Sequence, residues 1–171
     1  MNLAVALVQS EFMLLEDIPH FNDENSVNVI TNAKTWLNPA VPYSQSAYHN
    51  GYRTDCSGYV SMAWQLGTSA TTGTLANYSS PVTKDTLKAG DVLLNINEHV
   101  LIFSSWANTA KTQYYAYELS PSAPGTKYHV VDYPYWSNYN PSAYKPYRLH
   151  GNSIEQDAYL LWKGESFTIN W

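Results

Sequence analysis

A single cysteine, Cys56, stands at the start of a predicted helix, in the run Asp55-Cys56-Ser57-Gly58. The N-terminus of a helix stabilises a thiolate, and the thiolate is the form of cysteine that attacks a carbonyl carbon. A free cysteine is in general more often a small buried core residue. The polar residues on both sides of Cys56 favour the catalytic interpretation, so we predict that Cys56 is a nucleophile.

A cysteine nucleophile needs a base, and His99 is the candidate. It begins the run His99-Val100-Leu101-Ile102-Phe103, which predicts a β-strand with His99, Leu101 and Phe103 on one face. A histidine at the tip of a strand can reach the N-terminus of a helix that packs on the same sheet. An exposed histidine at a strand end, with no catalytic role, fits the pattern equally well.

The base in turn needs a polar group that orients its ring. Glu118 lies within the predicted strand 113–119, where a carboxylate is unexpected unless it has a partner. If this strand pairs with the strand of His99, Glu118 can accept the second ring N–H. A solvated glutamate on the outer face is the equal alternative, and Asp132 is the reserve candidate for the orienting role.

The three residues belong to an order of elements in which helices come first and strands follow. Helical spacing predicts helices over residues 26–37 and 55–67, and apolar runs predict strands over 92–96, 99–103 and 113–119. A short strand is expected around Val130 and Val131, residues 68–86 are expected to be a loop, and edge strands are expected over 144–149 and 159–162. This order predicts an α+β fold.

Local signals mark the ends of the two predicted helices. Asn and Ser, or Thr and Asp, are preferred N-caps, whereas Pro and Gly end helices. The expected end residues are Asn25 or Ser26 and Pro39 for the first helix, and Thr54 or Asp55 and Gly67 for the second.

A single domain is the expected organisation for a chain of 171 residues. Residues 1–25 are predicted to form an N-terminal arm or a short helix. Residues 120–171 are predicted to be a C-terminal elaboration, which either adds to the substrate side or closes the sheet.

Composition argues against several classes of protein. The net charge is −5 and no Lys/Arg cluster occurs, so a nucleic-acid partner is not expected. No apolar run approaches the roughly 20 residues of a membrane span, and residues 1–8 lack the basic segment of a secretory signal. The five histidines have no metal-ligand spacing, so neither metal nor cofactor is predicted. The 15 Tyr and six Trp residues predict an aromatic groove.

The run from Arg53 to Val60, Arg-Thr-Asp-Cys-Ser-Gly-Tyr-Val, resembles the nucleophile motif of the NlpC/P60 cell-wall peptidases. Two further blocks, residues 89–94 (Ala-Gly-Asp-Val-Leu-Leu) and 99–103, follow in that family's order. The upstream Val41-Pro42-Tyr43 is similar to the family's Pro-Tyr element. Together the similar blocks extend from about Trp36 to Glu118, roughly half of the chain.

This resemblance implies a papain-like core, in which a cysteine-bearing helix packs on a small antiparallel sheet. It implies that Cys56 is the nucleophile, that His99 is the base and that the backbone N–H of Cys56 belongs to the oxyanion hole. It also implies substrate-binding positions at Tyr43, Asp55 and Ser57. The chain departs from the family at the third catalytic position, where Glu118 replaces the usual His, Asn or Gln and is similar to the Glu of CHAP amidases.

The implied activity is hydrolysis of a peptidoglycan stem peptide, typically at the γ-D-glutamyl–diaminopimelate bond. Such an enzyme would be secreted, or would act in the periplasm or cell wall, for housekeeping or as an antibacterial effector. An effector would have an immunity protein as a further partner. The alternatives are an N-acetylmuramoyl-L-alanine amidase, a thiol amidase, deamidase or acyltransferase with a non-wall substrate, and a catalytically idle binding module.

Overall fold

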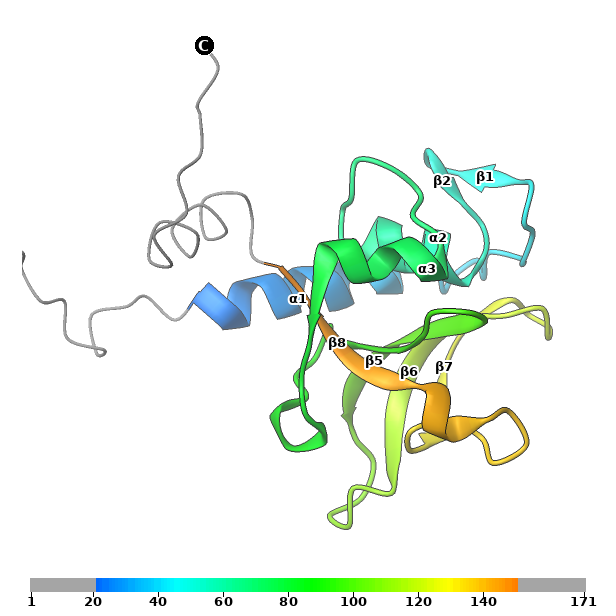
Figure 1. Ribbon diagram of the computed structural model, residues 1–171. Coiled ribbons are helices and arrows are strands. Elements are labelled where there is room, and N and C mark those ends of the chain that lie inside the picture. Colours follow the sequence, from blue (N-terminus) through cyan, green and yellow to red (C-terminus); the bar gives the residue numbers. More distant parts are fainter. Residues whose placement is uncertain (1–20, 151–171) are drawn as a thin grey trace, which may run out of the picture.

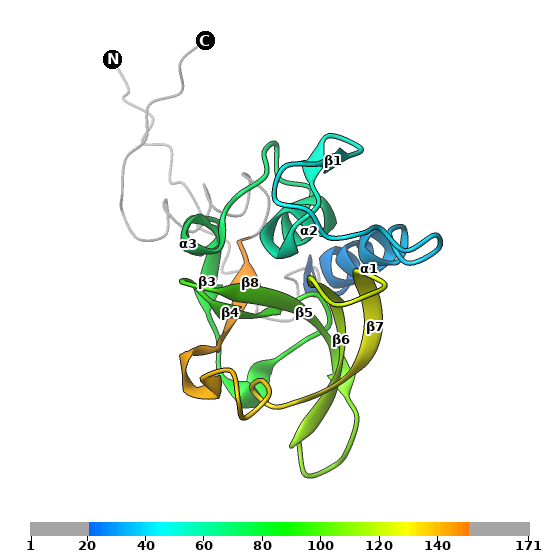
Figure 2. The ribbon, with the colours of Figure 1, turned by 90° about the vertical axis from the view of Figure 1, so that its right-hand side faces the viewer.

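The computed structural model describes residues 21–150, which form an α+β fold, as the order of elements predicts. Three α-helices, α1 (Phe21–Lys34), α2 (Cys56–Ala63) and α3 (Thr72–Leu75), lie together on one side of a curved sheet (Figures 1 and 2). A two-stranded hairpin of β1 (Tyr48–His49) and β2 (Tyr52–Arg53) precedes α2. Short 3-10 turns cover Ala76–Tyr78, Lys84–Thr86 and Pro141–Ala143.

The main sheet has six antiparallel strands in the order β3-β8-β4-β5-β6-β7. Their bounds are β3 (Ser79–Pro81), β4 (Val92–Asn95), β5 (His99–Trp106), β6 (Gln113–Leu119), β7 (Thr126–Asp132) and β8 (Lys145–Leu149). Because the strands are antiparallel, the start of β5, the end of β6 and the start of β7 lie side by side at one end of the strands.

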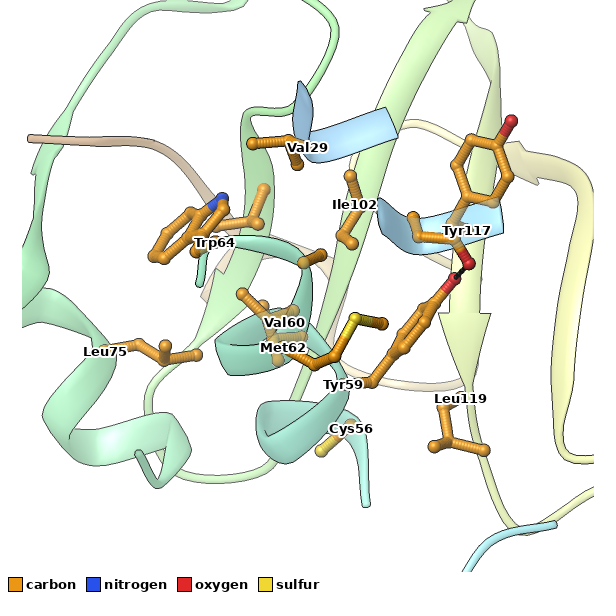
Figure 3. Close-up of a cluster of buried hydrophobic side chains, with 14 of the residues drawn as sticks. Val29, Cys56, Tyr59, Val60, Met62, Trp64, Leu75, Ile102, Tyr117 and Leu119 are labelled. Atoms are coloured by element: carbon orange, nitrogen blue, oxygen red, sulfur yellow. Dashed lines mark hydrogen bonds between the residues drawn. The ribbon is translucent and has the colours of Figure 1, made fainter. Parts of the chain in front are cut away.

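The sheet separates two apolar clusters, as period-two alternation requires. Val100 and Ile102 of β5 face the helices, where Val60 of α2 packs against them. Figure 3 shows this cluster, in which the hydroxyl of Tyr59 also donates to the carbonyl of Ala33 at 2.7 Å. On the opposite face, Leu101 and Phe103 join a second cluster with residues of β6, β7 and the segment 133–144, whose buried members include Tyr114, Val131, Tyr135 and Tyr144. The predicted alternation of β5 is therefore confirmed.

The helix that carries the cysteine begins as predicted but ends differently. Asp55 is its N-cap, and Oδ1 of Asp55 accepts the N–H of Gly58 at 2.8 Å. The predicted end at Gly67 is wrong. The helix ends at Ala63, and Gln65 adopts the left-handed conformation with φ 54°. The N–H of Leu66 then bonds the carbonyl of Ser61 at 2.9 Å, so the capping motif forms without glycine.

The first helix begins earlier than predicted, at Phe21, so Asn25 and Ser26 lie inside it and are not its N-cap. The helix ends at Lys34 and so does not reach Leu37, where the predicted helix ended before Pro39. Of the predicted N-terminal arm, only residues 21–25 are described, and they belong to this helix.

The predictions for the strands are confirmed for β4, β5 and β6, with β5 three residues longer than expected. β7 also extends beyond the short strand predicted around Val130. The strand over 145–149 exists, but it is not at the edge, since it lies between β3 and β4. The partner that covers it, β3, falls within residues 68–86, which were predicted to be a loop and which also contain α3. The predicted strand over 159–162 lies outside the described residues.

Within residues 21–150, no helix is both long and apolar enough to cross a membrane.

Candidate active site

Cys56 is the first residue of α2 and lines a pocket of about 430 Å³. The pocket lies where the start of β5, the end of β6 and the start of β7 are side by side. Figure 3 shows Cys56 at the end of the helix, next to the part of the sheet that contains Leu119. The pocket is also lined by His99, Glu118, Lys127 and His129, and by several aromatic residues described below. The structure therefore brings together the three residues predicted to be catalytic.

His99 is held by Glu118. Its Nε2 atom lies 2.8 Å from Oε1 of Glu118, and its side chain is 12% exposed. Burial of the ring opposes protonation. Hydrogen bonding to Cys56 and Glu118, together with their charges, outweighs burial and raises the pKa of His99 to about 9. His99 is therefore an imidazolium at neutral pH.

Glu118 is the centre of the polar network, although its side chain is only 2% exposed. Oε1 accepts from His99 and from the hydroxyl of Tyr135, the latter at 2.7 Å. Oε2 lies 2.8 Å from Nε2 of His129 and 3.5 Å from Nζ of Lys127. A buried carboxylate needs such partners, because an unpaired charge is costly to bury.

These partners determine the protonation state of Glu118. Burial alone would raise the pKa of Glu118, but the hydrogen bonds from His129, His99 and Tyr135 outweigh burial and lower it well below the usual range. An ionised carboxylate only accepts hydrogen bonds, so Nε2 of each histidine must carry a proton and donate. In His99, this leaves Nδ1 as the ring nitrogen that can exchange a proton with Cys56.

Sequence reasoning missed the residues that β7 contributes. Lys127 pairs in register with Glu118, and His129 pairs with Ala116, so both side chains lie on the same face as Glu118. A signal was available in the sequence, since Lys127, His129 and Val131 are every second residue and therefore share one face of the strand. The prediction extended this strand over Val130 and Val131 alone, which hid the alternation.

An aromatic wall closes the other side of the pocket, and its position is also a finding of the structure. Tyr135 lies 5.6 Å from His99, ring centre to ring centre, and stacks on Tyr144 at 4.4 Å. Burial, followed by the charge of Glu118, raises the pKa of Tyr135, so its hydroxyl stays protonated as a donor. Trp136 and Tyr139 also line the pocket. The segment 120–150 thus contributes both closing strands and the wall of the site.

Of the predicted substrate-binding residues, Tyr43 lines the pocket. Its loop packs against the turn between β6 and β7, where the N–H of Thr126 bonds the carbonyl of Val41 at 2.9 Å. A Cβ atom on Gly125 would lie 2.4 Å from that same carbonyl oxygen, so this close approach requires glycine.

Asp55 and Ser57 do not line the pocket but lie buried beside the start of α2. The guanidinium of Arg53 bonds the carboxylate of Asp55, and it bonds the hydroxyl of Ser57 at 3.1 Å and the carbonyl of Ala70 at 3.0 Å. Their side chains thus fix the orientation of the helix that carries Cys56. Arg53 reaches them from the β1–β2 hairpin, whose turn has positive φ at Asn50 and Gly51.

Two further acidic residues lie away from the pocket. Asp132, the reserve candidate, lies at the opposite end of β7 and accepts from the side chain of Gln113 at 2.9 Å. Asp91, in the second similar block, accepts a bidentate pair of bonds from Arg148, both 2.8 Å long. This pair ties β8 to the start of β4.

Within the described part of the chain, no group of three His, Cys, Asp or Glu side chains is arranged to hold a metal ion. The pocket wall itself carries a thiol, two imidazoles, two carboxylates and an ammonium group, from Cys56, His99, His129, Glu98, Glu118 and Lys127.

Comparison with known proteins returned no match: no family model, no curated protein and no solved structure is similar to this chain. The site itself and the motif resemblance are therefore the features of this chain that point to a function.

Proposed function

We propose that this protein is a cysteine hydrolase of the papain-like, NlpC/P60 type that cleaves an amide bond in peptidoglycan stem peptides. The bond we propose is the one between D-glutamate, through its γ-carboxyl group, and diaminopimelate. The observation that carries the proposal is the arrangement of Cys56, His99 and Glu118 in one pocket, with Nε2 of His99 held by Glu118 at 2.8 Å.

The papain-like assignment is supported by how the elements meet. A helix with cysteine at its first position packs on an antiparallel sheet, and the base and its orienting carboxylate come from neighbouring strands of that sheet. Catalytic triads are recognised by such geometry and by the roles of their members.

In the first half of the proposed reaction, the thiolate sulfur of Cys56 bonds to the carbonyl carbon of the scissile amide. The carbonyl oxygen becomes an oxyanion. When the carbon–nitrogen bond breaks, Nδ1 of His99 gives its proton to the departing nitrogen, which leaves as an amine. The products of this half are a thioester on Cys56, a neutral His99 and the released amine.

In the second half, a water molecule loses a proton to Nδ1 of His99 as its oxygen bonds to the thioester carbon. The carbon–sulfur bond then breaks, which returns the thiolate and the imidazolium and releases the acyl group as an acid. Glu118 keeps its own charge throughout, because its role is to fix the ring and to stabilise the imidazolium.

The start of α2 also supplies a group for the oxyanion. The N–H of Cys56 is in the first turn of a helix, where no intrahelical carbonyl accepts it. Asp55 instead caps the N–H of Gly58. The amide of Cys56 can therefore donate to the oxyanion.

The proposal is tested by mass analysis of muropeptides after incubation with the protein, alongside a Cys56→Ala control. We expect new products that correspond to cleavage between D-glutamate and diaminopimelate, and none with Cys56→Ala. Loss of a catalytic nucleophile costs several orders of magnitude in rate. Circular dichroism of the variant checks that the fold is intact.

Other products would assign other functions to the same residues. Release of the intact stem peptide from the sugar would identify an N-acetylmuramoyl-L-alanine amidase. If no muropeptide is cleaved while Cys56 still forms a covalent adduct with an acyl donor, the substrate is a non-wall amide or ester. Turnover by Cys56→Ala within tenfold of the parent would contradict the role of Cys56.

A further inference from the structure

The β7 side of the pocket carries a positive charge that the proposed reaction does not use. Nζ of Lys127 lies 2.8 Å from Oγ of Ser120 and 2.5 Å from Oγ of Ser122, both in the turn that follows β6. All three residues line the pocket. The side chain of Lys127 is 21% exposed, so it is partly withdrawn from water but still reachable from the pocket.

Together with the ammonium group of Lys127, the hydroxyls of the two serines form a charged hydrogen-bonding site. An ammonium group only donates, so each hydroxyl oxygen accepts from Lys127 and has its own proton to donate elsewhere. The hydroxyls of Ser120 and Ser122 lie 3.1 Å apart, and one can donate to the other. At least one hydroxyl proton therefore remains for a ligand, beside a positive charge. This combination suits a carboxylate.

Glu118 does not fully neutralise the positive charge of Lys127. The two groups are 3.5 Å apart, whereas Glu118 has shorter bonds to His99, His129 and Tyr135, all of 2.7 or 2.8 Å. Because His99 is also cationic, two positive charges surround the one carboxylate of Glu118.

The order of the strands places opposite charges on the two sides of His99. Glu98 lines the pocket from the β4–β5 turn, and Lys127 lines it from β7. β7 is two strands away from β5, a distance of roughly 10 Å at the usual spacing of strands. A substrate that crosses His99 therefore meets an acidic side and a basic side.

We propose that Lys127, Ser120 and Ser122 form a subsite for a free carboxylate on the substrate, close to the scissile amide. This inference rests on the proposed function, and it specifies the substrate further. A γ-linked D-glutamyl residue has such a carboxylate at its α-carbon, and conversion to the carboxamide removes the charge without changing the size. The pocket then selects the acid form over the amide form.

The test uses two peptides, L-alanyl-γ-D-glutamyl-diaminopimelate and the same peptide with the glutamate α-carboxylate as a carboxamide. We expect kcat/KM for the acid to exceed that for the amide by roughly tenfold to a hundredfold, the usual worth of a charged hydrogen bond. Equal values for the two peptides would overturn the subsite.

Variants assign the preference to particular residues. In Lys127→Met, the ratio of the two kcat/KM values should fall to near one, and in Lys127→Arg it should be largely kept. A ratio cancels any general loss of activity that arises through Glu118. Ser122 is an exposed residue of the turn, so Ser122→Ala is a second variant that does not endanger the fold, and it should lower the ratio severalfold. A parental ratio in both Lys127→Met and Ser122→Ala would refute the assignment.

Lys111→Met is the matched control, because Lys111 pairs with Asp85 outside this pocket at 3.2 Å. It removes the same charge and should keep the parental ratio.

A binding measurement separates this inference from the proposed function. Calorimetric titration of Cys56→Ala with each peptide needs no turnover. If the parent cleaves neither peptide but Cys56→Ala binds the acid at least tenfold more tightly than the amide, the subsite stands and the proposed reaction falls. If the parent cleaves both peptides equally and Cys56→Ala binds them equally, the reaction stands and the subsite falls.

Discussion

Glu118 holds His99 by Nε2, at 2.8 Å from Oε1, and so leaves Nδ1 as the ring nitrogen available to Cys56. The two residues lie on neighbouring antiparallel strands and on the same face of the sheet. Since the carboxylate also accepts from His129 and Tyr135, it has little freedom to move. The orientation of the His99 ring is therefore set by a network that is built into the sheet.

The charge on His99 predicts a specific pH dependence. With a pKa of about 9, the imidazolium proposed to protonate the leaving amine is present at neutral pH and is lost above about pH 9. We expect kcat/KM to fall as pH rises through 9, and NMR titration of the His99 ring to give the same midpoint. Both Cys56 and Glu118 raise this pKa, so Cys56→Ala and Glu118→Gln should each lower the midpoint. A midpoint near 6.5 in the parent would contradict the ion-paired site.

The raised pKa of His99 also makes the free energy of unfolding depend on pH. The pKa of His99 is raised in the folded protein, so its contribution is fully present below about pH 6.5, the value in an unfolded chain. That contribution is lost as pH rises from 6.5 through 9. Urea unfolding of the parent protein should therefore show a falling free energy of unfolding across this window, and the fall should be smaller in Cys56→Ala, which lacks one of the groups that raise the pKa. A flat profile there would argue against a raised pKa.

Substitution of Glu118 should impair catalysis less than substitution of His99, because Glu118 orients the ring but handles no proton of the substrate. We expect a loss in kcat of several orders of magnitude for His99→Ala and a smaller loss for Glu118→Gln. Asp132→Asn is the matched control, since Asp132 is a carboxylate of the same sheet whose side chain accepts from Gln113 at the far end of β7. If Asp132→Asn were crippled and Glu118→Gln unaffected, the orienting role would pass to Asp132.

Gly58 is predicted to be required for packing and not for chemistry. A Cβ atom at this position would lie 1.9 Å from the carbonyl oxygen of Arg53, so Gly58→Ala must displace the backbone. We expect a loss of about 3 kcal/mol in the free energy of unfolding, although alanine is the better helix former. Gly67→Ala is the control, because nothing lies within 4 Å of its added Cβ, and it should change stability by less than about 1 kcal/mol. Urea titrations of both variants measure the difference.

The pair between Asp91 and Arg148 should contribute to stability. Asp91 is 3% exposed, and its two oxygens accept from the same guanidinium. We expect Asp91→Asn to lower the free energy of unfolding by about 2 kcal/mol, because it weakens charged hydrogen bonds at a buried site. Asp85→Asn is the comparison, since the Asp85 side chain is 85% exposed and should contribute less than about 1 kcal/mol. Similar effects for the two substitutions would contradict this view.

Local signals were sufficient for the parts of the fold that depend on neighbours in sequence. Asp55 as N-cap, the alternation from His99 to Phe103 and the strand of Glu118 each follow from short-range preferences. These local signals failed where tertiary packing outweighed the intrinsic conformational preference of a residue. Asn25 and Ser26 became helix interior, and the helix of Cys56 ended with Gln65 in the conformation that usually favours glycine. Strand β8 was expected at an edge, because its neighbour β3 has only three residues and gives almost no pattern.

By itself, the sequence determined the types of group available for chemistry and the order in which they occur: one thiol, a histidine at a strand tip and a carboxylate in the next strand. Only the tertiary structure decided which side chains share a pocket. Strand order and register are set by contacts between residues far apart in the chain, and these bring Lys127, His129 and Tyr135 to Glu118. Asp55 and Ser57 lie off the pocket wall for a different reason, because Arg53, a near neighbour in sequence, bonds both of them beside the helix start. A buried carboxylate must collect its partners from whatever strands surround it, and no local pattern specifies them.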